Sequence, residues 1–428
     1  MERLPLFERH LVKKLAEERL RAIAEAVACR IEMEPDPGLM TGLAGQAIFL
    51  YQYGRIFASD RHENLGFLAL ERTLRMVEKG FSWPSFASGL AGIRWTLRYL
   101  AAQQFIRPVD AAALDGIGPY LQNFAAERFA AGDYDVLHGG LGMHMTDDGR
   151  PMTEDGRPMT DDGRKKAKAY HTITFPLFHT LQQLAVTTAD GIAWLSKNPK
   201  TDIPEINLGL AHGIPSILLL LSQELISDRR EPISERSEPL SERSESITLL
   251  EKGVEFLLST KLDKSSNASL FAHRMIDGKP DQPGRLAWCY GDPGVGQALW
   301  QIGANCGRTD WQEEATGILR RAAKRTDARA NRVYDACLCH GTAGLALLFY
   351  KMGMLTGHDE LLDAAGHWMR ATLDHGLNTG GSAGYLYLTT GNRYISNFSL
   401  LEGISGTGLA ILSLLEPDAM GWERGMMM

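Results

Sequence analysis

Short apolar stretches with helical spacing recur along the chain, and each follows a pair of glycines. Residues 46–53, 93–100 and 345–352 are examples. They are more apolar than one buried face requires, which favours helices buried on more than one side. Between them lie amphipathic, charge-rich stretches such as 11–27 and 311–328. We therefore predict a repeating unit of an outer amphipathic helix, a glycine turn and an inner apolar helix.

The glycine turns share the pattern Gly-x-x-Gly. Copies begin at Gly42, Gly89, Gly139, Gly291, Gly341 and Gly403, and a seventh, which begins at Gly213, ends in Ser216. The first glycines are 47 to 78 residues apart, and a period near 50 indicates a repeat architecture. Glycine suits such a turn because it tolerates positive φ and lets a second backbone approach closely. The sequence thus predicts an all-α fold of seven helix pairs in a single domain over 1–428, either an open solenoid or a closed ring.

Two long intervals between glycine motifs contain tandem heptads. Residues 145–165 hold three copies that begin Met-Thr, and residues 231–244 hold two copies that begin Glu-Pro. Both segments are polar, contain glycine or proline, and have no apolar face, so we interpret them as exposed loop insertions. A docking role for either segment is the alternative.

Composition narrows the classes of protein that fit this pattern. Hydrophobic residues are 44% and charged residues 23%, which suits a sizeable core and excludes whole-chain disorder. A net charge of −7 gives no basic field for nucleic acid, and we predict no nucleic-acid partner. No run reaches the roughly 18 apolar residues of a membrane span, and the N-terminus lacks the apolar core of a secretion signal. Five cysteines, an odd number, favour a reducing cytoplasm with metal-binding or catalytic thiols.

The places directly before each first glycine carry the candidate chemistry. One residue before it stand Thr41, Ser88, His138, His212, Tyr290, His340 and Glu402; two residues before it stand Met40, Ala87, Leu137, Ala211, Cys289, Cys339 and Leu401. Cys289 and Cys339 are equivalent residues in adjacent repeats, with His340 beside the second. Two thiolates and one imidazole, with a fourth position open, are typical of catalytic zinc. Unrelated core cysteines are the alternative.

Other polar residues are candidates for a fourth ligand or for catalytic roles. Cys337 is a possible fourth ligand, but we interpret it as a core thiol, as we do Cys29 and Cys306. His212, Asp135 and Arg285 could supply acid/base chemistry and anion stabilisation near such a metal. Their structural alternatives are a helix-start histidine, a helix cap and a solvated surface charge. His138 and His144 lie near the third repeat, but no further feature of the sequence assigns them a role.

Three motifs carry a family resemblance. Trp-Cys-Tyr-Gly at 288–291, Cys-His-Gly at 339–341 and Leu-Glu-Gly-Ile-Ser-Gly at 401–406 resemble the lanthionine synthetase C-like peptide cyclases, over nearly the whole chain. The resemblance implies an α/α toroid, which would close the ring. It implies zinc ligands at Cys289, Cys339 and His340. It implies further active-site residues at His212, Asp135, Arg285 and Tyr290.

The same resemblance implies a function. The chain would be a zinc-dependent cyclase that adds peptide cysteine thiols to dehydroalanine or dehydrobutyrine, forming thioether rings of the lanthionine type in the cytoplasm. Its substrate would be a dehydrated precursor peptide, with a separate dehydratase and an exporter as partners. The alternatives are a family member that handles glutathione, a zinc-binding adaptor without turnover, and a carbohydrate enzyme with an α/α toroid. The last would need a pair of carboxylates rather than a pair of thiolates.

Overall fold

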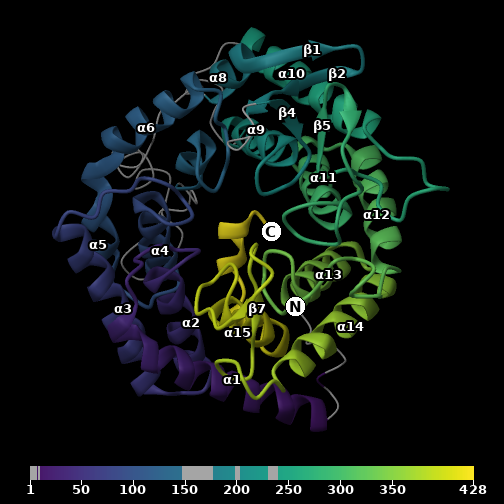
Figure 1. Ribbon diagram of the computed structural model, residues 1–428. Helices are drawn as coiled ribbons and strands as arrows, with labels where there is room; N and C mark the ends of the chain where they lie inside the picture. The colour runs from purple at the N-terminus through teal and green to yellow at the C-terminus, as the bar shows by residue number, and fades with distance from the viewer. Residues whose placement is uncertain (1–6, 8–9, 147–176, 198–202, 230–239) are drawn as a thin grey trace.

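The computed structural model describes residue 7 and residues 10–146, 177–197, 203–229 and 240–428, in which helices form a ring of two layers (Figure 1). The inner layer contains α2 (Leu43–Ile56), α4 (Leu90–Ala102), α9 (Ile214–Arg229), α11 (Asp292–Cys306), α13 (Thr342–Thr356) and α15 (Ile404–Leu415). The outer layer contains α1 (His10–Arg30), α3 (Asp60–Glu78), α5 (Pro108–Ala111), α6 (Gly118–Ala130), α8 (Leu177–Leu184), α10 (Leu240–Ser259), α12 (Thr309–Ala323) and α14 (Asp359–His375). The predicted all-α toroid is confirmed.

Short elements decorate the ring. The 3-10 helices are η2 (Ile31–Met33), η3 (Ala112–Ile117), η4 (Gly140–Thr146), η6 (Pro417–Ala419) and η7 (Trp422–Met426). The strands form three small antiparallel sheets. The first pairs β1 (Ala185–Thr188) with β2 (Gly191–Trp194), and the last pairs β7 (Tyr387–Leu388) with β8 (Tyr394–Ile395). The sheet between them contains, in spatial order, β3 (Ser196–Lys197), β4 (Pro204–Asn207), β5 (Arg274–Ile276) and β6 (Lys279–Pro280). The C-terminal end of the chain lies near the middle of the ring (Figure 1).

Backbone hydrogen bonds join six of the seven successive pairs of turns, and the contact between Asp135 and His212 (2.5 Å) joins the third turn to the fourth, so the ring is closed. The residues two places before each motif are joined from Met40 N to Ala87 O (2.7 Å), Ala87 N to Leu137 O (2.8 Å), Ala211 N to Cys289 O (3.3 Å), Cys289 N to Cys339 O (3.2 Å), Cys339 N to Leu401 O (3.1 Å) and Leu401 N to Met40 O (2.9 Å). The last bond joins the seventh repeat to the first. The turns therefore surround one mouth, where side chains from distant repeats meet.

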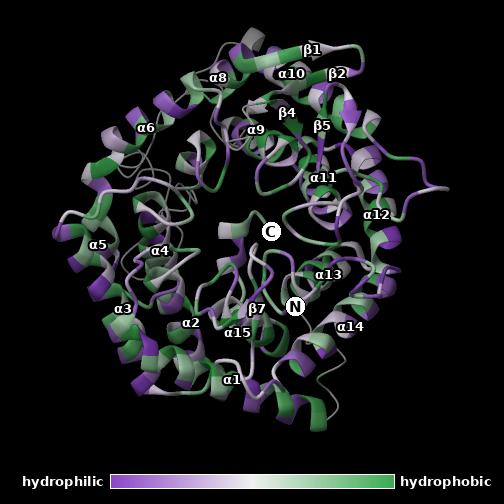
Figure 2. Ribbon diagram, in the orientation of Figure 1, coloured by the Kyte–Doolittle hydropathy of each residue, from purple (hydrophilic) through white to green (hydrophobic). Residues whose placement is uncertain are grey.

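The two layers differ in burial as their sequences predict. Inner helix α13 buries every residue from Thr342 to Tyr350, whereas outer helix α12 buries a stripe that includes Trp311, Ala315 and Ile318. In Figure 2 the inner helices are mostly apolar, and the outer helices alternate between apolar and polar faces. Among the described residues, no helix combines the length and apolar character needed to cross a membrane.

Two local predictions differ from the structure, and parts of a third lie outside the described residues. After the third glycine motif the described chain forms the 3-10 helix η4 instead of an inner α-helix. Of the first heptad array, residues 147–165 lie outside the described residues, as do 231–239 of the second. The last five residues of the predicted second loop, 240–244, belong to α10. A helix anchored by the buried Leu249 and Leu250 extends through polar residues because propagation costs little once a nucleus exists.

Close approach explains most of the motif glycines. A Cβ on Gly344 would lie 1.8 Å from the carbonyl oxygen of Leu338, and one on Gly406 would lie 1.8 Å from that of Leu400. The Gly406 Cβ would also lie 2.6 Å from the Leu338 side chain of the neighbouring repeat. Positive φ, the other reason for glycine, applies at Gly291, where φ is 87°.

Gly344→Ala is expected to lower the free energy of unfolding by about 1–3 kcal/mol, the usual cost of overpacking, because the Leu338 backbone cannot rotate away. Gly317→Ala is the matched control. Gly317 lies within α12, and nothing is within 4 Å of its Cβ position, so alanine there should stabilise by about 0.5–1 kcal/mol. Chemical denaturation of the two variants measures both effects. Equal stability of the two variants would contradict the close-approach explanation.

Candidate functional site

Two thiols and one imidazole converge on the mouth of the ring. The ligand atoms of Cys289, Cys339 and His340 all lie within 4.8 Å of one another. Cys289 and Cys339 are buried, and the bond between their backbones (3.2 Å) holds the two turns together. Both cysteines immediately precede inner helices, so the repeat itself places them side by side. The three side chains can hold one metal ion.

The electrostatics of this cluster favour an anionic sulfur. Hydrogen bonding to the Cys339 thiol holds the pKa of Cys289 well below its ordinary range, against the effect of burial, and His340 and Arg285 lower it further. Burial alone would lower the pKa of His340, but its hydrogen bond and charge interaction with Cys289 raise that pKa overall. A thiolate and imidazole set is a soft donor set of the kind that binds zinc.

A second possible cluster shares one member with the first. Ligand atoms of Asp335, Cys337 and His340 also lie within 4.8 Å of one another. Both carboxylate oxygens of Asp335 are engaged, since Oδ1 accepts the Cys337 N–H (3.0 Å) and Oδ2 the Leu388 N–H (3.0 Å). Burial raises the pKa of the Cys337 thiol well above its usual value. The pKa of the Cys339 thiol is raised as well, so this shift does not separate the two clusters. Because both Asp335 oxygens are committed to backbone N–H groups, the second cluster is less suited to a metal than the first.

Asp335 belongs to a repeated feature that sequence analysis missed. Six residues before the first glycine stand Asp36, Asp133, Asn207, Asp335 and Asn397, and each accepts the backbone N–H of the residue two places on. Such Asx turns shape the loop that leads into each motif. In the fifth repeat this place is taken by Arg285 instead. The recurrence of Asp or Asn at this spacing was visible in the sequence.

Asp135 and His212 form a pair across two repeats. His212 Nδ1 lies 2.5 Å from Asp135 Oδ2. Asp135 Oδ1 accepts the backbone N–H groups of Leu137 (2.7 Å) and His138 (2.9 Å). Asp135 is thus a turn-capping residue and the partner of a histidine at once.

This pairing sets the protonation of both groups. Burial would raise the pKa of Asp135, but the hydrogen bond and charge of His212 outweigh it and lower the pKa. Burial would lower the pKa of His212, and the hydrogen bond and charge of Asp135 raise it instead. The pair therefore favours a charged imidazole beside a carboxylate, and the imidazolium persists to higher pH than in a free histidine. Because Nδ1 faces Asp135, Nε2 is the ring nitrogen left to exchange a proton with a bound molecule.

Tyr290 connects the histidine pair to the metal-binding cluster. Its ring centroid lies 5.9 Å from that of His212 and 4.9 Å from that of His273, and its hydroxyl accepts a hydrogen bond from Asn207 Nδ2 (3.1 Å). Burial raises the pKa of Tyr290 to about 12, so the phenol stays protonated at neutral pH. Asn207, the last residue of β4, occupies the recurrent Asp/Asn position of its repeat, whereas His273 comes from a loop that no sequence motif marks as part of the site.

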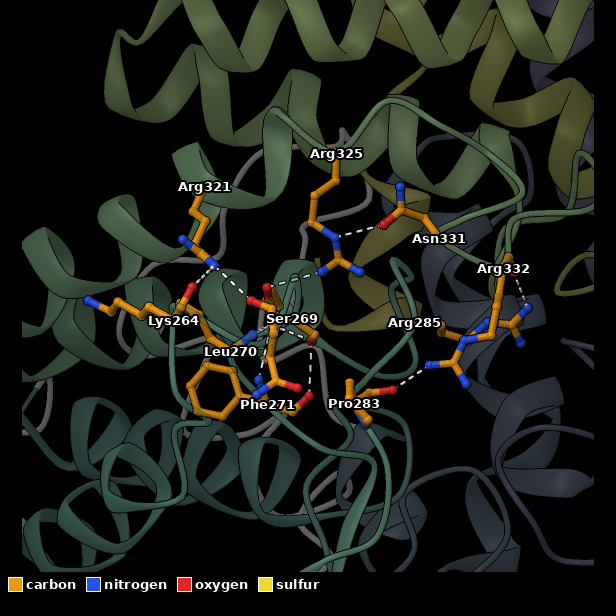
Figure 3. A network of polar contacts seen from close by, with 12 residues as sticks. Lys264, Ser269, Leu270, Phe271, Pro283, Arg285, Arg321, Arg325, Asn331 and Arg332 are labelled. Atoms are coloured by element: carbon orange, nitrogen blue, oxygen red, sulfur yellow. Dashed lines mark hydrogen bonds and ion pairs between the residues drawn. The ribbon is translucent and has the colours of Figure 1, made fainter.

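Arg285 is held at the site through its neighbours (Figure 3). Its Nη2 donates to the carbonyl oxygen of Arg332 (2.5 Å), and its backbone N–H donates to His273 Nε2 (3.3 Å). Arg332 adopts a φ of 59°, and its guanidinium donates to Gln282 Oε1 (3.2 Å) and to the carbonyl oxygen of Pro283. This double contact fastens the two loops together, and it places a cation where it lowers the pKa of Cys289.

A buried ion pair braces the adjoining framework. Asp292, at the start of α11, accepts Ser269 Oγ (2.9 Å) and the Leu270 N–H (2.8 Å) at Oδ1, and Arg325 Nη1 (3.1 Å) at Oδ2. Arg325 Nε also donates to Asn331 Oδ1 (2.7 Å), next to Arg332 (Figure 3). Removing one partner of such a pair is costly, so these contacts tie the start of α11, next to Cys289, to the segment that leads to Arg332.

His138 also reaches this site. Its ring stacks against that of His212, with 6.5 Å between centroids and 15° between planes. It is exposed to solvent. The available signal was that His138, His212 and His340 occupy the same place in their repeats.

The chain belongs to a known family. The family described as "Lanthionine synthetase C-like protein" matches residues 34–427. The fold is similar to that of a solved structure, "Nisin cyclase", with a TM-score of 0.71 and 18% identity, over 95% of this chain and 96% of that one. None of the curated proteins matches this chain.

Proposed function

We propose that this protein is a zinc-dependent cyclase that closes thioether rings in dehydrated peptides. The observation that carries the proposal is the convergence of Cys289, Cys339 and His340 beside the Asp135–His212 pair. A metal set that activates a thiol and an acid/base pair that supplies a proton are the two components that would accelerate addition of a thiol to an alkene at neutral pH. Family membership and the nisin cyclase-like fold support the same assignment.

Cys289, Cys339 and His340 are the residues that would hold the zinc ion. Their soft donors fit zinc, and three protein ligands leave one position open, as in catalytic sites. Zinc bound there would lower the pKa of the substrate thiol to make it a nucleophile at neutral pH.

The chain's own residues manage the proton that the addition requires. The substrate thiol loses its proton, its sulfur bonds to the β-carbon of the dehydro residue, and the alkene electron pair shifts toward the α-carbon, which then takes a proton. His212 is placed to deliver that proton from Nε2, while Asp135 orients the ring through Nδ1. Arg285 supplies a positive charge close to Cys289, which suits the anion that forms on the adjacent carbonyl.

Ring-closure assays test this proposal directly. The zinc-loaded chain is incubated with a dehydrated peptide that keeps its cysteines, and free thiols are then alkylated and counted by mass spectrometry. Each ring removes one alkylation without changing the peptide mass. The uncatalysed reaction is subtracted, because thiols add to dehydroalanine unaided at alkaline pH. No excess rings over that background would contradict the proposal.

The same assay separates the alternatives. With glutathione added, an enzyme that uses glutathione would increase the peptide mass by one glutathione per dehydro residue. An adaptor would bind the peptide and change neither its mass nor its thiol count. The Asp135–His212 pair favours an enzyme, since a binding protein has no use for a part-buried acid/base pair that remains open to the mouth of the ring.

Asp135→Asn is expected to move the alkaline limit of ring closure to lower pH. The carboxylate raises the pKa of His212, so the imidazolium that donates the proton persists to higher pH in the wild type. Because the pKa of His212 is raised in the folded chain, its charge interaction with Asp135 also adds to the free energy of unfolding. This contribution is present below the ordinary histidine pKa and is lost as pH rises through the raised pKa of His212. Rates measured from pH 5 to 9 check the shift. If the alkaline limit of ring closure did not move in Asp135→Asn, His212 would not be the group that sets this limit.

A further inference from the structure

One exposed histidine contacts the acid/base pair without a role in the reaction described above. His138 is solvent-exposed, and its ring lies parallel to that of His212 at 6.5 Å. Its backbone N–H donates to Asp135 Oδ1 (2.9 Å), so the carboxylate that binds His212 also holds the His138 backbone. The ring of His138 therefore lies beside that of His212 and is open to solvent.

His212 must recover a proton after every ring closure. Its Nδ1 is occupied by Asp135, and its side chain is 28% exposed. The thiol of the substrate releases one proton and the α-carbon gains one, so no net proton is consumed. His212 nevertheless has to be reprotonated at Nε2, on the side where the peptide binds.

We propose that His138 restores this proton, acting through His212 as an exchange group between solvent and the acid/base pair. This inference rests on the proposed cyclase function. A single water spans two hydrogen bonds of about 2.8 Å each, which is enough to link ring nitrogens of two stacked imidazoles at this separation. His138 takes a proton from solvent and passes it to His212 through such a water.

The charges around His138 agree with this role. The surrounding protein partly desolvates His138, and this lowers its pKa. The charge of His212 lowers that pKa further, whereas the carboxylates of Asp135 and Asp133 raise it. Because the two imidazoles repel one another when both are charged, His138 is neutral while His212 holds its proton. A neutral exposed imidazole exchanges protons rapidly with solvent near neutral pH.

The test compares His138→Phe and His138→Ala in ring closure at low buffer concentration. Phenylalanine keeps an aromatic ring against His212 but carries no proton. In both variants the first ring per chain should close at the wild-type rate, because His212 starts protonated. Later rings should close about 10-fold to 100-fold more slowly than in the wild type. The larger value equals the smallest contribution usual for a positioned acid/base. Imidazole added to the buffer should restore the later rings and leave the wild type unchanged.

Distinct outcomes contradict the proposal. Wild-type rates for later rings in both variants would overturn it. So would recovery in His138→Phe alone without imidazole, which would assign the residue to packing. Zinc content and peptide affinity should match the wild type, and His10→Phe on outer helix α1 is the control for loss of an exposed histidine. A wild-type chain that closes no rings would refute the cyclase function itself, whereas the other two results refute only the role of His138.

Discussion

Cys339→Ala is expected to lose most of the zinc bound by the purified chain, and ring closure with it. The variant removes one of three proposed ligands, and two remaining donors do not make the three-residue set of a catalytic site. Cys289→Ala should behave in the same way. Metal analysis after dialysis, reported as zinc per chain, measures the effect.

The other cysteines are the matched controls. Cys29→Ala and Cys306→Ala should keep the metal, because neither thiol belongs to a cluster of possible ligands among the described residues. Cys337→Ala tests the second cluster. It should keep the metal, since Asp335, the carboxylate of that cluster, is committed to backbone N–H groups at both oxygens. Zinc retained by Cys339→Ala but lost from Cys337→Ala would move the site to the second cluster.

His212→Ala is expected to slow ring closure by about 10² to 10⁴, the usual contribution of a positioned acid/base. It should keep its zinc and still bind the dehydrated peptide, because His212 is not among the proposed ligands. Cys289→Ala should fail differently, by losing the metal. Thiol alkylation with mass spectrometry follows ring closure, and metal analysis separates the two failures.

Wild-type ring closure by His212→Ala would remove the proposed proton donor. The histidine would then be a structural residue that satisfies Asp135. The free energy of unfolding provides a second check, because loss of the ion pair should destabilise the chain more at pH 6 than at pH 9. Above its raised pKa the His212 ring is neutral, and less interaction remains to be lost.

The sequence by itself determined the repeat and indicated which thiols lie close together. Glycine is required wherever an inner helix begins against the backbone of its own turn, as at Gly344. Because such a turn recurs about every fifty residues, the spacing of the glycines predicted the repeat. Equivalent residues of adjacent repeats become neighbours, so the convergence of Cys289 with Cys339 and His340 followed from their spacing. The helix pattern followed too, because inner and outer helices differ in how many faces they bury.

Only the tertiary structure decided whether the ring closes and which distant residues meet. The bond between Leu401 and Met40 depends on the summed rotation of all repeats, which no local pattern records. Asp135 and His212 are 77 residues apart, and the part of the chain between them includes the polar heptad array 145–165, which has no apolar periodicity. The support of Arg285 by Arg332 depends on a single left-handed backbone at a non-glycine residue. These contacts arise from long-range packing, whereas sequence patterns report on local burial and close approach.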